Sequence, residues 1–121
     1  MQRSQRDTTR KNDASRLLAA VNDSRAANRG QLPAAGANVN TQIVDRYVTV
    51  GGSTFVDPAS GNPYTTGTIL NGAQAGNIGA GTMQVIRNAQ CGDNGTAVAG
   101  NGVVIRAGVE SSPNVAYCLQ G

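Results

Sequence analysis

The first thirty residues carry the pattern that most constrains how this 121-residue chain can fold. Residues 3–29 are predicted to form one long helix, because charges of opposite sign recur at helical spacing, as in Asp7 and Lys11. Gly30 is typical of the position that follows a helix, and Pro33 comes soon after it. We therefore expect the helix to end at about residue 29.

Four apolar residues of this helix form one stripe at helical spacing: Ala14, Leu17, Leu18 and Val21. Extended toward the N-terminus, the stripe passes through Asp7, Arg10 and Lys11. Charged side chains are not buried without partners. We therefore expect the helix to pack on its own domain only from about Ala14 onward, with its first turns protruding.

The positive charge of the chain belongs to this helix. Residues 1–30 hold seven basic and three acidic residues, whereas residues 31–121 hold three basic and four acidic ones. A basic helix can bind nucleic acid or anionic lipid. Here the acids are interleaved with the bases, and aromatic residues, which stack on bases, make up only 3% of the chain. A solvated charged face is the simpler interpretation, and no specific nucleic-acid partner is expected.

The last third of the chain is predicted to be β-structure. Three runs rich in β-branched residues are the expected strands: residues 82–88, 102–110 and 114–120. Turn sequences at 92–95 and 111–114 separate them, and residues 96–99 are a candidate fourth strand. Val103, Ile105, Ala107 and Val109 share one face of the middle run. The expected fold class is α+β: a long N-terminal helix packed on an antiparallel meander of three or four strands.

Residues 30–81 are predicted to be a long connecting loop within a single domain, residues 1–121. Residues 41–48 form either a short helix capped by Asn40 or a strand, because Ile43, Val44, Tyr47 and Val48 fit both patterns. Two prolines and a glycine make residues 57–64 a turn region, and residues 71–81 are expected to be a flexible loop.

Cys91 and Cys118 are the two cysteines of the chain, and there is no histidine. Their spacing does not fit a metal site, so a disulfide is expected if the protein is exported. Two free thiols in a cytosolic protein are the alternative. A bond would join the two ends of the meander. We expect no cofactor and no metal.

No catalytic constellation is recognised. The usual nucleophile and base pairs are absent without histidine, and Asp57 and Glu110 stand alone in sequence. Asp57 is expected to be a turn residue rather than a cation ligand. No run of 18 apolar residues is present, so this stretch of chain contains no predicted membrane span.

The overall arrangement resembles the soluble part of a bacterial type IV pilin. The resemblance covers nearly the whole chain and rests on RDTTRKNDASRLLAAVNDSRAANRGQLP, FVDPASGNPY, and the two cysteines in QCGDNG and AYCLQ. It implies a pilin-like fold in which a hydrophobic segment upstream of residue 1 anchors the subunit in the membrane before assembly. The chain would then be a truncated soluble domain.

The resemblance also implies which residues carry the function. Residues 1–13 would form a neck whose charges pair between subunits, and the candidates are Arg3, Arg6, Asp7, Arg10, Lys11 and Asp13. Residues 30–81 would shape subunit contacts. Cys91 and Cys118 would bound an exposed C-terminal loop involved in adhesion.

The function that this resemblance implies is that of a non-enzymatic structural subunit. It would polymerise into an extracellular cell-surface pilus for adhesion, twitching motility or DNA uptake. Its partners would be other pilin subunits, the assembly machinery and a receptor on a host cell or surface. A pseudopilin of a secretion or DNA-uptake system is the first alternative, although the two cysteines favour a pilin. A basic-helix module that binds DNA or an anionic surface is the second.

Overall fold

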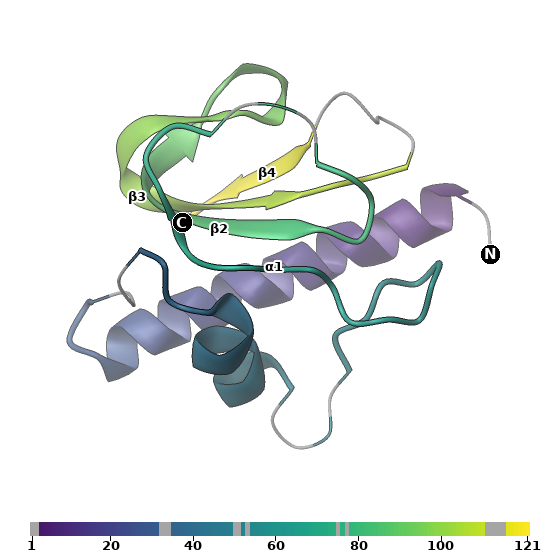
Figure 1. Cartoon of the computed structure of the whole chain (residues 1–121), viewed down its shortest axis with the longest axis horizontal. Helices are drawn as coiled ribbons and strands as arrows, with labels where there is room; N and C mark the ends of the chain where they lie inside the picture. The colour runs from purple at the N-terminus through teal and green to yellow at the C-terminus, as the bar shows by residue number, and fades with distance from the viewer. Residues whose placement is uncertain are drawn as a thin grey trace.

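The computed structural model describes residues 3–31, 35–49, 52, 54–74, 76, 78–110 and 116–121. Its elements, in chain order, are α1 (Arg3–Ala27), η1 (Asn40–Val48), β1 (Leu70–Asn71), β2 (Met83–Cys91), η3 (Asp93–Gly95), β3 (Ala97–Ala107) and β4 (Tyr117–Gln120). Figure 1 shows α1 lying along one face of the sheet, with η1 beside it. The fold is therefore α+β, with an N-terminal helix covering a sheet, as predicted.

The sheet is mixed rather than wholly antiparallel. Its strand order is β1-β2-β3-β4, with β2–β3 and β3–β4 antiparallel and β1 parallel to β2. Residues 97–99 are not a separate fourth strand, because they continue β3 and pair with residues 89–91 of β2. The fourth strand is instead Leu70–Asn71, which the sequence placed in a loop. The predicted turn at 111–114 lies outside the described residues.

The hairpin of β2 and β3 is bent by a register shift. Ala89 pairs with both Ala99 and Gly102, and the preceding Asn88 has a φ of 55°. Such a bulge bends the strands and increases their twist. The bend folds the outer half of the hairpin over the far face of the sheet, where a second small core forms from Ile86, Ala89, Ala97 and Val104. Both faces of β3 are therefore buried from Val103 to Ala107.

The predicted stripe of α1 lies in the main core. Ala14, Leu17 and Val21 are fully buried, and Leu18 is partly buried against the same cluster. The residues that they cover include Val85 and Ile105 of the sheet. Full burial of one such aliphatic side chain contributes about 1.5–3 kcal/mol relative to exposure, so this stripe anchors the helix on the sheet.

The two helix ends show which capping predictions hold. α1 ends at Ala27, and the Gly30 N–H, at a φ of 80°, donates to the Arg25 carbonyl at 2.6 Å. This is a Schellman cap, in which Arg29, at a φ of 59°, holds the left-handed C′ position that the sequence assigned to Gly30, and Gly30 follows at C″. η1 is a helix and not a strand, but Asn40 does not cap it. The Asn38 side chain accepts a hydrogen bond from the Thr41 N–H at 3.0 Å instead.

Cys91 and Cys118 form a disulfide, as expected, with 6.0 Å between their Cα atoms. It joins the end of β2 to β4, so it also fastens the folded-over hairpin to the sheet. Closing a loop with a sequence separation of 27 stabilises the fold by about 3–4 kcal/mol in the chain-entropy estimate. Among the described residues, no helix combines the length and apolar character needed to cross a membrane.

Candidate functional site on the N-terminal helix

The buried stripe of α1 does not stop at Ala14 but continues to the first turns of the helix. Asp7, Arg10, Ala14, Leu17 and Val21 follow each other at alternating spacings of three and four residues, and all five are buried. This spacing places them on one face of the helix. The expectation that the first turns protrude from the domain is therefore wrong.

Arg10 is the centre of the charged part of this stripe, with a side chain only 1% exposed. Its Nε donates to Asp57 Oδ1 at 2.6 Å. Its Nη1 donates to Asp7 Oδ1 at 3.0 Å and to Glu110 Oε2 at 2.6 Å. One guanidinium thus joins the helix to the 57–64 turn region and to the end of the segment that follows β3.

Arg6 adds a second guanidinium one turn earlier on the helix. Its Nε and Nη2 donate to the two carboxylate oxygens of Glu110, at 2.6 and 2.9 Å. This paired geometry is the strongest arrangement for an arginine and a carboxylate. The Glu110 backbone N–H in turn donates to Asp7 Oδ1 at 2.8 Å. Arg6 and Glu110 are each 24% exposed, so this pair closes the network at the surface.

Asp57 is held by its own turn as well as by the helix. Its Oδ2 accepts from the backbone N–H groups of Ala59 and Ser60 at 3.3 and 3.2 Å. Gly81 packs against the same side chain, because a Cβ atom there would lie 3.6 Å from the Asp57 Cγ. The prediction that Asp57 is a turn residue holds, but the turn also serves to present its carboxylate to Arg10.

The network keeps its members ionised. Burial alone would lower the pKa of Arg10, but hydrogen bonds to Asp57, Glu110 and Asp7 raise it above its ordinary value. Burial would likewise raise the pKa of Asp57, yet the bond from Arg10 and the backbone donors lower it overall. Hydrogen bonds from Arg6 and Arg10 lower the pKa of Glu110 to about 2. At neutral pH two guanidinium groups therefore face three carboxylates.

Asp13 forms a second buried contact on the adjacent helix face. Its Oδ2 accepts a hydrogen bond from the Tyr64 hydroxyl at 2.6 Å, and its Oδ1 accepts one from Arg16 at 3.1 Å. Burial, followed by the bond to Asp13, raises the pKa of Tyr64 well above its ordinary value, so the phenol remains a donor. Phe55 packs on Tyr64 with ring centroids 4.7 Å apart.

The six predicted interface residues therefore lie in different environments. Asp7, Arg10 and Asp13 are buried within their own chain and have no surface to offer a neighbouring subunit. Arg6 is largely engaged by Glu110, while Lys11 is exposed, with its Nζ 5.2 Å from the centroid of the Tyr117 ring. The Arg3 side chain lies outside the described residues.

Sequence reasoning missed three partners of this helix: Asp57, Tyr64 and Glu110. All three are distant in sequence, and no local motif marks them. The signal that could have found the two acids is the charge balance, because the helix carries an excess of positive charge and the rest of the chain a small excess of negative charge, whereas nothing in the sequence marks Tyr64. Intramolecular pairing of the helix with later acids follows from that complementarity.

The network leaves little scope for acid–base or metal chemistry. Asp7, Asp57 and Glu110 already accept hydrogen bonds from guanidinium groups. Within the described part of the chain, no group of three or more histidine, cysteine or acidic residues is placed to hold a metal ion. The ionic network instead fixes the first turns of α1 to the rest of the domain.

The opposite face of α1 is exposed and carries a line of small, uncharged residues, with the exposed Lys11 and Asp23 beside that line. The small residues recur at spacings of three and four: Ser4, Thr8, Asn12, Ser15, Ala19, Asn22 and Ala26. Two of the hydroxyl groups are already used within the helix, because Thr8 donates to the Ser4 carbonyl at 2.9 Å and Ser15 donates to the Lys11 carbonyl at 3.2 Å. This face can therefore approach another surface closely, and these two hydroxyls would leave no unsatisfied donor.

No protein-family model matches this chain, and neither a curated protein nor a solved structure matches it.

Proposed function

We propose that this protein is a non-enzymatic structural subunit of an extracellular type IV pilus-like filament. In this proposal a hydrophobic segment upstream of residue 1 continues α1 and anchors the subunit before assembly. The subunits then pack side by side through their helices. The assembled filament serves adhesion, twitching motility or DNA uptake.

The observation that carries the proposal is the two-sided character of α1. One face is fixed to the domain along its whole length, by the ionic network at one end and the apolar stripe at the other. The other face is exposed and carries a continuous line of small, uncharged side chains, with Lys11 and Asp23 beside it. At 1.5 Å per residue, the 25-residue helix is about 37 Å long, so it offers an extended surface along which neighbouring subunits can pack.

The proposed subunit contact therefore differs from the one that the sequence suggested. The buried charges at Asp7, Arg10 and Asp13 hold α1 to its own domain. The contact between subunits would use the small outward face, centred near Ala19, with Lys11 at its border. Small residues on a helix face allow two helix backbones to approach closely, as in the interfaces of membrane helices.

A substitution at the centre of this face tests the proposal. Ala19→Arg adds a long charged side chain at an exposed helical position, where arginine has a good helix propensity. We expect the urea midpoint of the purified domain to remain unchanged, while negative-stain microscopy of antibody-labelled producing cells shows loss of surface filaments.

Ala99→Arg is the matched control, since Ala99 is an exposed alanine on β3 and not on the proposed helix face. Filaments should persist in that variant. Normal filaments in Ala19→Arg cells would contradict the helix-face contact. Absence of any filament from cells with the parent protein, together with a reading frame that encodes no hydrophobic segment before Met1, would overturn the pilin proposal itself.

The two alternatives make different predictions. A pseudopilin would have the upstream segment but no long surface filament at native expression. A basic-helix module for DNA would show salt-sensitive binding. The ionic network does not favour this last alternative, because Arg6, Arg10 and Arg16 already contact carboxylates of their own chain.

A further inference from the structure

The outer half of the β2–β3 hairpin, residues 89–102, is held to the sheet by little apolar packing. Among its described residues, Ala89 and Ala97 are the apolar side chains that are fully buried. The larger members of the second core, Ile86 and Val104, belong to the inner half of the hairpin. Because an alanine gains much less hydrophobic free energy on burial than these side chains do, other contacts must hold the outer half in place.

The hydrogen bonds that position the hairpin tip come with the cost of a buried charge. Arg106 donates to the Gly95 carbonyl at 2.7 Å, and its other two bonds also go to neutral acceptors, Gln84 Oε1 and the Gly76 carbonyl. The residue is only 1% exposed, and burying a cation among neutral groups is unfavourable. Arg106 therefore fixes where the tip lies but adds little net stability to that position.

The disulfide is the covalent attachment of the outer half. It joins Cys91 to Cys118 of β4. The Cys91 N–H also donates to Gln120 Oε1 at 3.0 Å, and two backbone bonds of 2.8 and 2.9 Å join Ala97 to Gln74. Water replaces such partners when a segment opens, so each hydrogen bond contributes modestly. The disulfide is therefore the attachment on which the closed position most depends.

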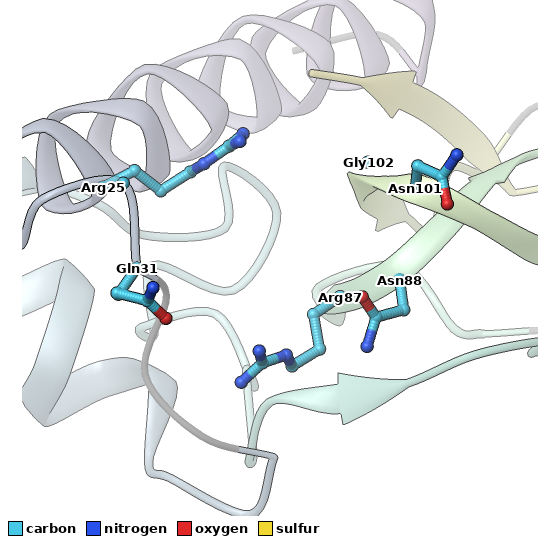
Figure 2. Close-up of a pocket in the computed structure, with 7 residues that line it drawn as sticks. Arg25, Gln31, Arg87, Asn88, Asn101 and Gly102 are labelled. Atoms are coloured by element: carbon cyan, nitrogen blue, oxygen red, sulfur yellow. The ribbon is translucent and has the colours of Figure 1, made fainter.

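The base of the outer half is irregular, so it can serve as a hinge. Asn88 has a φ of 55°, and Ala89 pairs with both Ala99 and Gly102, which interrupts the ladder. On the side of the helix this region borders an open pocket whose described lining consists of arginine, asparagine, glutamine and glycine residues. Figure 2 shows Asn88 and Asn101 on the two strands at this point. Movement here would not disrupt the main core.

The disulfide is accessible to a reductant. Cys91 and Cys118 are each partly exposed, and exchange requires a thiolate to reach one of the two sulfur atoms. A dithiol would give two electrons and two protons to the bond. The dithiol then becomes a disulfide, and the two cysteines become free thiols.

We propose that the Cys91–Cys118 disulfide is a redox-sensitive switch: reduction by a dithiol releases residues 89–102 from the far face of the sheet, and oxidation returns them. The main core and β4 stay folded in both forms, because β4 pairs with β3 and its Leu119 packs on the main core. Release uncovers Ile86 and Val104, so the reduced form presents an apolar surface that the oxidised form covers. The proposal is independent of the filament function.

The test is NMR spectroscopy of the purified protein before and after addition of dithiothreitol. We expect the amide signals of residues 90–100 to move to random-coil positions, and the NOEs from the Ala97 methyl group to the second core to disappear. The methyl signals of Leu17, Val85 and Ile105, which lie in the main core, should keep their dispersed positions. Removal of the dithiol and oxidation in air should restore the original spectrum.

A double variant separates the effect of the bond from that of the reagent. Cys91→Ser combined with Cys118→Ser should give the open spectrum without dithiothreitol, and the reagent should then change nothing. Native signals for residues 90–100 in the reduced parent protein would overturn the switch. Loss of the native methyl signals of the main core would overturn it as well, because the whole molecule would then have unfolded.

Discussion

Whether a charged residue of α1 can be buried depends on partners that lie far away in sequence. Arg10 and Asp7 occupy core positions of the helix, where an isolated charge would be strongly unfavourable. They are accommodated because Asp57 and Glu110, 47 and 100 residues from Arg10, complete their hydrogen bonds. A buried ion pair contributes little net stability, but removing one partner leaves an uncompensated charge.

Substitution of Arg10 should therefore be far more harmful than loss of an exposed arginine. Arg10→Met keeps much of the side-chain volume but leaves Asp7 and Asp57 without their shared guanidinium. We expect the free energy of unfolding, measured with urea, to fall on the order of 3–5 kcal/mol.

The control for this substitution is Arg46→Met, at an exposed position, where we expect a change within about 0.5 kcal/mol. A similar small effect for both variants would show that Arg10 does not hold the helix to the domain.

At the scale of elements, the folded-over hairpin is held by one buried arginine. Arg106 is 1% exposed and donates to the Gly95 carbonyl at 2.7 Å, Gln84 Oε1 at 2.8 Å and the Gly76 carbonyl at 2.6 Å. Burial lowers the pKa of Arg106, and the acceptors of these three hydrogen bonds are neutral groups. The hairpin tip must approach β4 closely for these bonds to form.

Gly95, at the hairpin tip, permits this close approach. A Cβ atom at Gly95 would lie 1.8 Å from the Ala116 carbonyl oxygen, whereas one at Gly61 would meet no atom within 4 Å. The two glycines have nearly the same φ, 72° and 73°.

Gly61→Ala should therefore cost about 1–2 kcal/mol in unfolding free energy, from backbone strain alone. Gly95→Ala should cost about 1–3 kcal/mol more, because the carbonyl must also be displaced. Urea unfolding of the two variants measures the difference. Equal costs would show that the tip does not pack on residue 116.

On the scale of the whole molecule, the fold is joined at three places. The apolar stripe of α1 covers the sheet, the ionic network fastens the first helical turns, and the disulfide ties β2 to β4 (Figure 1). Two of the three depend on chemistry that changes with conditions, since carboxylates protonate in acid and disulfides can be reduced.

Acid should destabilise the molecule through Glu110. Its pKa falls from the ordinary value of 4.5 to about 2 in the folded protein. A lowered folded pKa stabilises the fold above the unfolded pKa, and this contribution is lost as the pH falls through the folded pKa. We therefore expect the urea midpoint to decrease between about pH 4.5 and pH 2.

Glu110→Gln should have a lower midpoint at pH 6 and a shallower pH dependence below pH 4.5, because the titrating group is gone. Asp45→Asn, which removes an exposed acid from η1, should keep the pH dependence of the parent protein. Parallel curves for the parent and Glu110→Gln would exclude Glu110 as the source of the acid sensitivity.

Features that depend on neighbours in sequence could be predicted. The helix and the approximate place where it ends, the burial of Leu17 and Val21, and the extended runs of the last third follow from local spacing and turn chemistry. The parallel strand at Leu70–Asn71 could not be predicted, because two residues carry no periodic pattern. Nor could the bend at Ala89, since a register shift depends on the partner strand.

By itself, the sequence determined that this protein has a long N-terminal helix with one apolar stripe, a β-structured last third and two cysteines suited to a disulfide. Only the tertiary structure decided the fate of the charged front half of that helix. The same residues could either protrude or be buried, depending on whether carboxylates and a hydroxyl from distant segments reach them. Asp57, Tyr64 and Glu110 do reach them, so the charges face inward, and a line of small residues faces outward.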